Sequence, residues 1–330
     1  MAFALPWLAC GLVIAPVQAR ADVYQSSQTL MGTRVDLTLH GTDADLLPVA
    51  AQAAWAEMAR LTDMMSRYRP TSALNAVNLA AGLQPVPVPP ELMQVLHMAR
   101  QACADSAGGF DATVGSLRGW DFSASPAAVP SAQQIAAQLP LVDQPHGLVL
   151  DTSAGTAYLT RRGMRLDLGG IAKLPILQAG LRALQRHGVS NAMVNGGGDV
   201  LVSGQLQGRP WRIGLRDPRQ PQRLLGSVAL TEGFVAASGD YERFVLQGGR
   251  RLHHILDPKT GYPTQGPHGV ALISTQLDAI NGLGAAIMVA GAQAGRARVA
   301  RTPGLDALIV DADNQLWLSP GMAQRLRAST

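Results

Sequence analysis

The sequence predicts an α+β fold, with mixed sheets of antiparallel strands and flanking helices. From residue 147 onward, many short segments alternate apolar and polar residues, as strands do when one face is buried. Helical patterns separate some of these segments without alternating regularly with them, which disfavours a parallel sheet. The chain has 330 residues, of which 47% are hydrophobic and 15% charged, so it has ample material for a core in one large domain or two.

The N-terminal residues 1–21 are typical of an export signal. An apolar run ends in small residues at Ala19 and Ala21, which fits cleavage after Ala21. The run is too short and too interrupted by proline for a membrane span. The residues before Cys10 fit a lipoprotein signal poorly. We therefore expect simple export to the periplasm, with residues 22–330 forming the mature protein.

Charge and cysteine content exclude several functions. The net charge is +4, and the arginines are scattered rather than grouped in a basic stripe, which argues against nucleic-acid binding. After cleavage Cys103 is the remaining cysteine, and its apolar helical surroundings favour a small core residue over a nucleophile. The sequence has no CxxC or Cys/His cluster, so a zinc site is not expected.

The first half of the chain contains one strand and two clear helices. Residues 33–40 alternate as a strand does, whereas residues 44–65 and 90–104 place apolar side chains at helical spacing. Pro90 suits the first turn of the second helix. Residues 123–146, rich in Ser, Ala, Pro and Gln, predict a loop with a short helix.

The second half is dominated by strands. A helix is expected at about 172–187, ending at Gly188 as its C-cap, and a second helix at about 279–300. A pair of strands within 306–318 ends the pattern. The other strands are expected at 148–151, 156–159, 164–168, 191–195, 199–204, 211–216, 227–231, 242–247, 251–256 and 269–274.

Both lysines of the chain lie in compact motifs of polar residues and glycine. Lys173 closes residues 166–173 (LDLGGIAK), where a strand runs through Gly169 and Gly170 into a helix. The N–H groups of a helix N-terminus bind anions, and Lys173 adds a positive charge. The alternative is close helix–strand packing that needs glycine. Lys259 lies within residues 253–261 (HHILDPKTG), and we expect both lysines to face one phosphate-rich site.

Two further glycine-rich turns carry aspartates. Residues 108–115 (GGFDATVG) present Asp111 after a tight turn, where it could bind a ribose or base or, more commonly, cap the turn. Residues 195–199 (NGGGD) end a buried strand. Three glycines there indicate either close approach of a ligand or a plain hairpin turn.

Reactive side chains gather in two later segments. Residues 236–243 (AASGDYER) hold Ser238, and His254, Asp257 and Lys259 precede a Pro/Gly turn. The clustering of imidazole, carboxylate and ammonium favours a functional site there. Ser238 with His254 superficially resembles a serine hydrolase, but no GxSxG elbow surrounds the serine.

Taken in order, these segments resemble the ApbE family of FAD:protein FMN transferases. The resemblance runs from residue 31 to residue 291 and is carried by several motifs. They are residues 31–33 (MGT), 66–68 (SRY), 72–78, 109–114 (GFDATV), 167–173 (DLGGIAK), 195–199 (NGGGD), 238–243 (SGDYER) and 254–261 (HILDPKTG). It implies an ApbE-like, T-fold-related single domain with two lobes.

The resemblance also implies an activity. Such enzymes are exported, bind FAD with a divalent metal, usually magnesium, and move FMN onto a Thr or Ser hydroxyl of a partner protein, releasing AMP. Lys173, His254 and Asp257 would be catalytic, with His254 as proton acceptor. Tyr68 would stack on the flavin, and Asp111 would hold the adenosine end. The implied FAD-binding residues are Met31, Tyr68, Asp111, Gly169, Gly170, Lys173, Asn195, Gly197, Asp199, Ser238 and His254.

This chain departs from the family pattern at three places. Leu174-Pro175 follows Lys173 where the family has Gly-Tyr or similar, and Ala237 precedes Ser238 where the family has threonine. The family's metal-binding Asp and Thr are replaced by Asn281 and Ala285.

The metal ligands that the resemblance implies therefore differ from those of the family pattern. They are the Ala172 carbonyl, Asn281 and, as a possible substitute, Asp278. The altered ligands leave open a catalytically degenerate FAD-binding or maturation protein. Hydrolysis of FAD by water is a third possibility. The implied acceptor is a membrane-associated electron-transfer subunit or a factor for a respiratory reductase.

Overall fold

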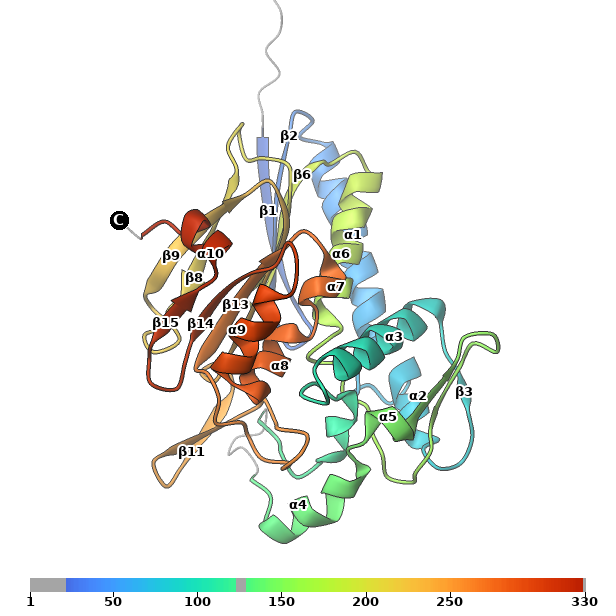
Figure 1. Ribbon diagram of the computed structural model, residues 1–330. Coiled ribbons are helices and arrows are strands. Elements are labelled where there is room, and N and C mark those ends of the chain that lie inside the picture. Colours follow the sequence, from blue (N-terminus) through green and yellow to red (C-terminus); the bar gives the residue numbers. More distant parts are fainter. Residues whose placement is uncertain (1–21, 123–128, 329–330) are drawn as a thin grey trace, which may run out of the picture.

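A computed structural model describes residues 22–122 and 129–328 of the protein (Figure 1). The predicted export signal over residues 1–21 lies outside this part of the chain. The α+β prediction is confirmed, because one large antiparallel sheet is covered by helices and a second, mainly helical lobe lies at one end of it. None of the helices in the described residues is both long and apolar enough to span a membrane.

The large sheet has eight strands within the described residues, and each neighbouring pair is antiparallel. The order across the sheet is β1-β2-β6-β7-β10-β13-β14-β15. These strands are β1 (Asp22–Leu30), β2 (Thr33–Gly41), β6 (Asn191–Gly196), β7 (Asp199–Ser203), β10 (Glu232–Gly239), β13 (Gly269–Ser274), β14 (Asp306–Val310) and β15 (Leu316–Leu318).

Both faces of the central strands are buried. Because side chains alternate along a strand, Val270 and Leu272 join one core while Ala271 and Ile273 join another. The first core lies under α1 (Leu46–Met65), α6 (Lys173–Arg186), α8 (Leu283–Ala290) and α9 (Ala292–Ala300). The second core is covered by β8 (Trp211–Arg216), β9 (Leu224–Leu230) and α10 (Pro320–Arg325).

The second lobe shares the first core, which makes the molecule a single domain with two lobes. Leu92, Leu96 and Leu159 of this lobe belong to the same buried cluster as the sheet residues. The lobe contains α2 (Ala73–Leu79), α3 (Pro90–Asp105), α4 (Ala132–Gln138), α5 (Gln144–Gly147), β3 (Val86–Pro87), β4 (Leu148–Asp151), β5 (Thr156–Leu159) and the 3₁₀ helices η1 (Ala112–Ser116) and η2 (Leu139–Leu141).

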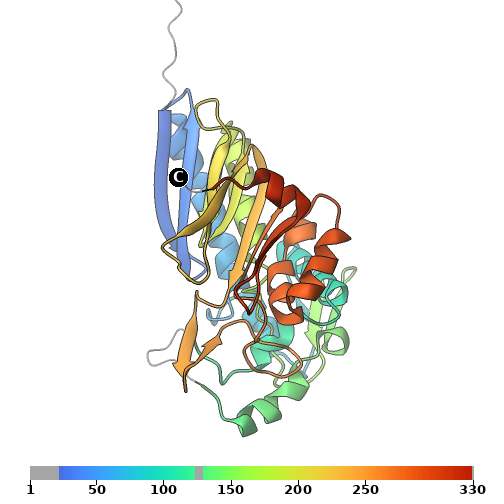
Figure 2. The same ribbon diagram turned by 60° about the vertical axis from the view of Figure 1, so that its left-hand side comes forward.

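A β-hairpin projects from the end of the molecule near the second lobe. Its strands β11 (Phe244–Gln247) and β12 (Arg250–His253) pair with each other and form a separate two-stranded sheet (Figure 2). In the sequence the hairpin lies between two strands of the large sheet, because it directly follows β10 and precedes β13. The hairpin therefore presents residues 253–266 next to the sheet.

Several predicted helix boundaries are confirmed by their capping interactions. Ser131 and Gln134 form a capping box at the start of α4, the short helix expected within residues 123–146. Helix α6 ends at Arg186 with His187 as its C-cap residue, and Gly188 follows with a positive φ of 82°, as expected for the glycine that terminates a helix.

Two predicted elements were wrong. Residues 164–168 form no strand, because their backbone bonds to side chains and loops: Leu166 N donates to Asn78 Oδ1 (2.7 Å), and Asp167 N donates to Ala112 O (2.7 Å). The helix expected over 279–300 is three helices, α7 (Leu277–Ile280), α8 and α9. Gly282 and Gly291 separate them with φ of 75° and 90°.

The strand β1 was not predicted from the sequence. It pairs along its whole length with β2 at the edge of the sheet. Its side chains from Val23 to Leu30 are exposed or only half-buried, so these residues show no apolar alternation. An edge strand of this kind gives no periodic signal.

Candidate active site

The turn between β1 and β2 lies at one end of the large sheet and touches the hairpin segment. Met31 and Gly32 both have left-handed backbone conformations, with φ of 54° and 68°. The Arg243 Nη2 donates a hydrogen bond to the Gly32 carbonyl (2.9 Å). This contact joins residues that are 211 positions apart in the sequence.

The turn between β6 and β7 packs beside the first. Gly197 and Gly198 have φ of 64° and 98°, and Asn195 Oδ1 accepts a hydrogen bond from Gly198 N (3.2 Å). A Cβ on Gly197 would collide with the Thr33 side chain, so glycine is needed there for close approach as well as for conformation. The hairpin-turn alternative is thus confirmed. Ligand approach to this turn stays a prediction.

Lys173 and Asp199 form an ion pair where three elements meet. The Lys173 Nζ lies 3.0 Å from Asp199 Oδ2, and Asp199 Oδ1 accepts a hydrogen bond from Ala237 N (3.1 Å). The start of α6, the β6–β7 turn and β10 are thereby tied together. An ammonium group has three donors, so two of those on Lys173 remain for a ligand.

Ser238 lies on β10 against the start of α8. A Cβ on Gly284 would lie 2.5 Å from Ser238 Oγ, so glycine permits this close contact. Within the described part of the chain, Ser238 and His254 share no hydrogen bond, and the serine-hydrolase alternative gains no support.

The two consecutive histidines have different roles. His253 is buried, its Nδ1 accepts a hydrogen bond from Ile255 N (3.3 Å), and its Nε2 therefore donates to Thr264 O (2.9 Å). These bonds fix the strand end. His254 is exposed, and its Nδ1 lies 3.3 Å from the Arg243 carbonyl. A proton on Nδ1 leaves the Nε2 lone pair as the acceptor.

The surroundings of His254 favour its neutral form. Although its side chain reaches solvent, nearby protein atoms remove hydration from the ring. This desolvation, together with the electrostatic effects of His253, Arg243 and Lys173, lowers the pKa of His254 to about 4. The Arg243 carbonyl acts in the opposite direction. His254 is therefore a neutral imidazole near pH 7.

Asp257 shapes a turn. Its carboxylate accepts hydrogen bonds from Lys259 N (2.9 Å) and Thr260 Oγ1 (3.3 Å), and its carbonyl accepts one from Gly261 N (2.8 Å). Lys259 itself is exposed on this turn. The two lysines lie on different turns: Lys173 pairs with Asp199 beside the β6–β7 turn, whereas Lys259 lies on the exposed turn that Asp257 caps.

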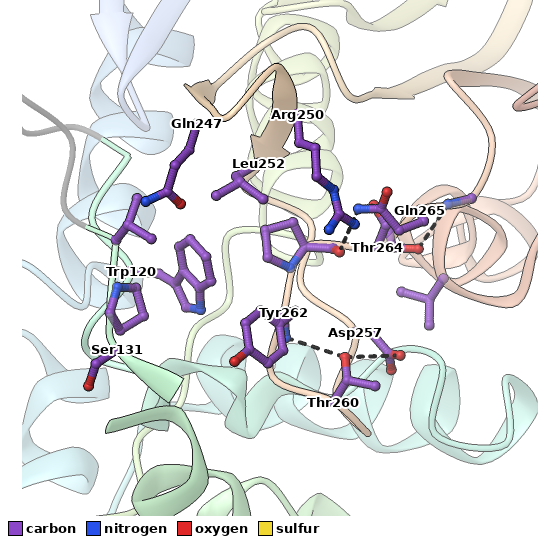
Figure 3. A pocket seen from close by; sticks show the side chains of 15 residues that line it. Trp120, Ser131, Gln247, Arg250, Leu252, Asp257, Thr260, Tyr262, Thr264 and Gln265 are labelled. Carbon is purple, nitrogen blue, oxygen red and sulfur yellow. Dashed lines mark hydrogen bonds between the residues drawn. The ribbon is translucent and has the colours of Figure 1, made fainter. Parts of the chain in front are cut away.

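Asp257 also lines a pocket of about 970 Å³ on the hairpin side of this segment (Figure 3). Neither Lys173 nor His254 is among its lining residues. The indole N–H of Trp120 donates to the Gly261 carbonyl (2.9 Å), and the Tyr262 ring meets the indole edge-on with centroids 6.4 Å apart. Gln247, Arg250 and Leu252 of the β11–β12 hairpin form another wall.

Asp111 serves as a cap within the second lobe. One carboxylate oxygen accepts hydrogen bonds from Thr113 N (2.7 Å) and the Thr113 hydroxyl, and the other accepts one from Gln144 N (3.0 Å). Burial raises the pKa of Asp111, while these hydrogen bonds oppose the rise. The turn-capping alternative is confirmed, and the adenosine contact stays a prediction.

Tyr68 is 72% exposed and is held by its neighbour Arg67. The guanidinium of Arg67 lies over the ring (4.8 Å to the centroid) and also pairs with Asp167 (3.1 Å). Asp167 Oδ1 in turn accepts a hydrogen bond from Gly169 N (2.8 Å). Tyr68 is thereby linked to the Gly169–Gly170 turn.

Sequence reasoning missed the roles of Arg67 and Arg243. Arg67 connects the predicted flavin-stacking tyrosine to the glycine turn, and Arg243 connects the Met31–Gly32 turn to His254. Both arginines lie within the sequence motifs described above. The signal that could have found them was an arginine at the centre of residues 66–68 and at the end of residues 238–243.

A sequence model of the ApbE family matches residues 31–309. The chain belongs to the ApbE family. It is 33% identical over 312 residues to an FAD:protein FMN transferase of Klebsiella pneumoniae (strain 342), covering 93% of this chain and 94% of that protein. The Treponema pallidum (strain Nichols) FAD:protein FMN transferase is 30% identical over 336 residues, covering 96% and 92%.

Solved ApbE structures have the same fold. The Thermotoga maritima ApbE protein superimposes with a TM-score of 0.85 at 30% identity, covering 93% of this chain and all of that one. The Vibrio cholerae flavin transferase ApbE gives a TM-score of 0.80 at 26% identity, with the same coverage. The predicted ApbE-like fold is therefore confirmed.

The residues expected to bind a metal, Ala172, Asn281 and Asp278, do not fit a magnesium site here. Asn281 is 8% exposed, and its Nδ2 points at Met98 Sδ (3.7 Å). Asp278 is exposed, and the Ala172 carbonyl accepts the first-turn bond of α6 from Ile176 N (3.1 Å). Magnesium normally needs one or two carboxylates in octahedral geometry. In residues 22–122 and 129–328 no group of three His, Cys, Asp or Glu side chains could hold a metal.

Proposed function

We propose that this protein transfers the FMN moiety of FAD to a Thr or Ser hydroxyl of a partner protein and releases AMP. The observation that carries the proposal is the Lys173–Asp199 pair within electrostatic range of a neutral, exposed His254 in a chain of the ApbE family. Transfer from a pyrophosphate to a hydroxyl needs both a cation and a proton acceptor at one site.

The cations would bind and orient the FAD pyrophosphate. Lys173 is fixed by Asp199, and Arg243 is fixed by the Gly32 carbonyl, so each group is positioned before the ligand arrives. Preorganised donors stabilise developing charge without reorganisation during the reaction. Tyr68, exposed next to the Gly169 turn, would stack on the flavin ring.

His254 would accept the proton of the incoming hydroxyl at Nε2. The hydroxyl oxygen attacks the phosphorus on the flavin side of the pyrophosphate and forms the new phosphoester bond. The bond from this phosphorus to the bridging oxygen breaks, and AMP leaves with that oxygen. Because Nδ1 faces the Arg243 carbonyl, the ring is oriented with Nε2 free to receive the proton.

Hydrolysis of FAD to FMN and AMP is a second candidate, because water could take the place of the hydroxyl at the same His254. An FAD-binding protein without transferase activity is a third. Both would use the same binding residues, and the choice among them depends on whether a protein hydroxyl reaches the site.

The partner would be a membrane-associated electron-transfer subunit or a factor for a respiratory reductase, in the periplasm. The support for this location is the apolar run before Ala21, whose small residues fit export and cleavage. A fusion of residues 1–30 to a reporter enzyme that folds only outside the cytoplasm would test export directly.

The decisive experiment incubates purified protein with FAD and a synthetic threonine peptide, in excess magnesium chloride and in EDTA. A peptide mass increase equal to FMN, with equimolar AMP, is the expected result. The same peptide with alanine for threonine should gain nothing. AMP release with no gain on any acceptor would favour hydrolysis, and FAD binding without AMP would favour the third candidate.

A further inference from the structure

The segment expected to hold a metal is packed as an apolar contact, while two cations of the site, Lys173 and Arg243, are anchored by neighbouring groups. We infer that Lys173 and Arg243, rather than a magnesium ion, neutralise the FAD pyrophosphate in this protein. The inference rests on the proposed function. It concerns the residues that perform one part of that function.

The metal-ligand segment is closed by its own packing. Gly282 has a left-handed conformation, and a Cβ there would lie 2.9 Å from the Ile171 side chain. Gly284 is buried against Ser238. The Asn281 amide is turned toward the Met98 sulfur, a soft apolar neighbour rather than an ion. This region offers a hard divalent cation neither a carboxylate nor an open position.

Lys173 supplies the first positive charge. Asp199, which is 8% exposed, holds the ammonium through Oδ2 and is itself fixed by Ala237 N. The lysine side chain remains 28% exposed, so it is accessible to a ligand. One of its three donors is used by Asp199, and the other two can bind phosphate oxygens.

Arg243 supplies the second positive charge. A guanidinium has five N–H donors, and the contact with the Gly32 carbonyl uses one of them. Arg243 is exposed, and its carbonyl contacts the ring of His254. Lys173 and Arg243 both act electrostatically on the same ring, which supports their location around one position.

Lys173 and Arg243 offer one cationic group for each negatively charged phosphate of a pyrophosphate diester, although the Asp199 carboxylate offsets part of the Lys173 charge. During transfer the negative charge that develops on the leaving AMP is stabilised by the same groups. The acceptor proton goes to His254 Nε2, the new oxygen–phosphorus bond replaces the bond to the bridging oxygen, and no further reactant is needed.

The test measures FAD affinity by calorimetry, with and without magnesium. Wild-type protein should bind FAD with the same Kd in EDTA and in excess magnesium chloride, within about twofold. Lys173→Met should weaken binding about 10- to 100-fold in both buffers, because charge-assisted hydrogen bonds are lost. Lys259→Met removes the same charge from the exposed turn and should leave Kd unchanged.

Lys173→Met leaves Asp199 without its cation and could unfold the protein, so Arg243→Gln provides a second variant at an exposed position. It should also weaken FAD binding, by about tenfold, without rescue by magnesium. A thermal melt of each variant separates lost binding from lost folding. A wild-type Kd that falls tenfold or more on adding magnesium would overturn the inference.

The two proposals fail in different ways. Peptide transfer that proceeds only with magnesium would leave the proposed function intact and overturn the inference. Metal-independent FAD binding that requires Lys173, without transfer to any acceptor, would retain the inference about binding and reject the transferase. If Lys259→Met lost as much FAD affinity as Lys173→Met, this would contradict the assignment of Lys173 as the lysine that binds the pyrophosphate.

Discussion

The candidate site combines two sets of residues with different surfaces. The first set is the cationic cluster of Lys173 and Arg243 together with the neutral His254, and each member is fixed by a neighbour: Asp199, the Gly32 carbonyl and the Arg243 carbonyl. The second set, residues 281–285, is neutral and mostly buried. The first set contains charged and polar groups that lose hydration when they are placed in the protein, whereas the second set is packed against apolar side chains.

The difference between the two sets indicates which of them binds a ligand. Partly exposed charged groups add little to folding, so their anchoring contacts are better explained by binding. The buried residues at 281–285 are explained by contacts with Met98 of α3 and with Ile171, which precedes α6. Predictions that disturb one set of residues and spare the other can test this explanation.

His254→Ala should have the largest effect. Loss of a positioned proton acceptor typically lowers kcat about 10²- to 10⁴-fold, and FAD binding should change little because the ring makes no ion pair with phosphate. Transfer kinetics and FAD titration together check this. The control is His187→Ala, at the far end of α6, where Nδ1 bonds to Ala183 O. A loss of FAD affinity as large as the loss of kcat would make His254 a binding residue.

Asp111→Ala should act on the fold. Thr113 N and Gln144 N would lose their acceptor inside the protein, which costs about 1–3 kcal/mol of unfolding free energy. Urea denaturation measures the loss. Should stability hold while FAD affinity falls, Asp111 would be the adenosine ligand that the family resemblance implies.

The sequence predicted the sheet and the site to different extents. The strand over residues 269–274 was identified because a strand that is buried on both faces shows as a continuous apolar run with sharp ends. The sequence pattern missed β1, an edge strand with polar faces, and it placed a strand at 164–168 where the Asn78 side chain replaces a ladder. Such long-range side-chain partners cannot be read from local periodicity.

The sequence predicted the motifs of the site, but it did not predict which residues of each motif face the site and which stabilise the fold. Local sequence could not show that His253 turns into the core while His254 faces the cationic cluster, because the choice depends on Thr264 and Arg243. Nor could it show that Asp257 caps a turn facing a separate pocket. The helix expected over 279–300 failed for a simpler reason, since Gly282 and Gly291 adopt positive φ.

Asp240→Asn should lower kcat about tenfold by loosening the position of His254. Asp240 is buried and binds Arg219, Arg251 of β12 (3.0 Å) and His268 (3.0 Å), so it holds the base of the hairpin. FAD affinity should be retained, because Lys173 is anchored separately.

The matched control for that variant is Asp306→Asn, a carboxylate paired with Arg325 (2.8 Å) on the far side of the sheet. It removes a comparable ion pair and should leave kcat unchanged. Equal effects of the two variants on kcat would mean that Asp240 acts through general stability and not through the hairpin.

The smallest effect is expected from pH, between about 6 and 8, where transfer should be flat. His254 must be neutral to accept a proton, and its depressed pKa of about 4 keeps it so until the solution becomes strongly acidic. The rate is therefore lost as pH falls through this value.

The kcat/KM profile reports the free enzyme, whereas kcat reports the FAD complex, in which the negative pyrophosphate raises the pKa of His254. The acid limb of kcat should accordingly lie at higher pH than that of kcat/KM. In Lys173→Met the kcat/KM limb should move upward, because one of the positive charges that depress the pKa is gone. If the acid limb of the kcat/KM profile were unchanged in that variant, Lys173 would not act electrostatically on His254, and the two residues would not belong to one site.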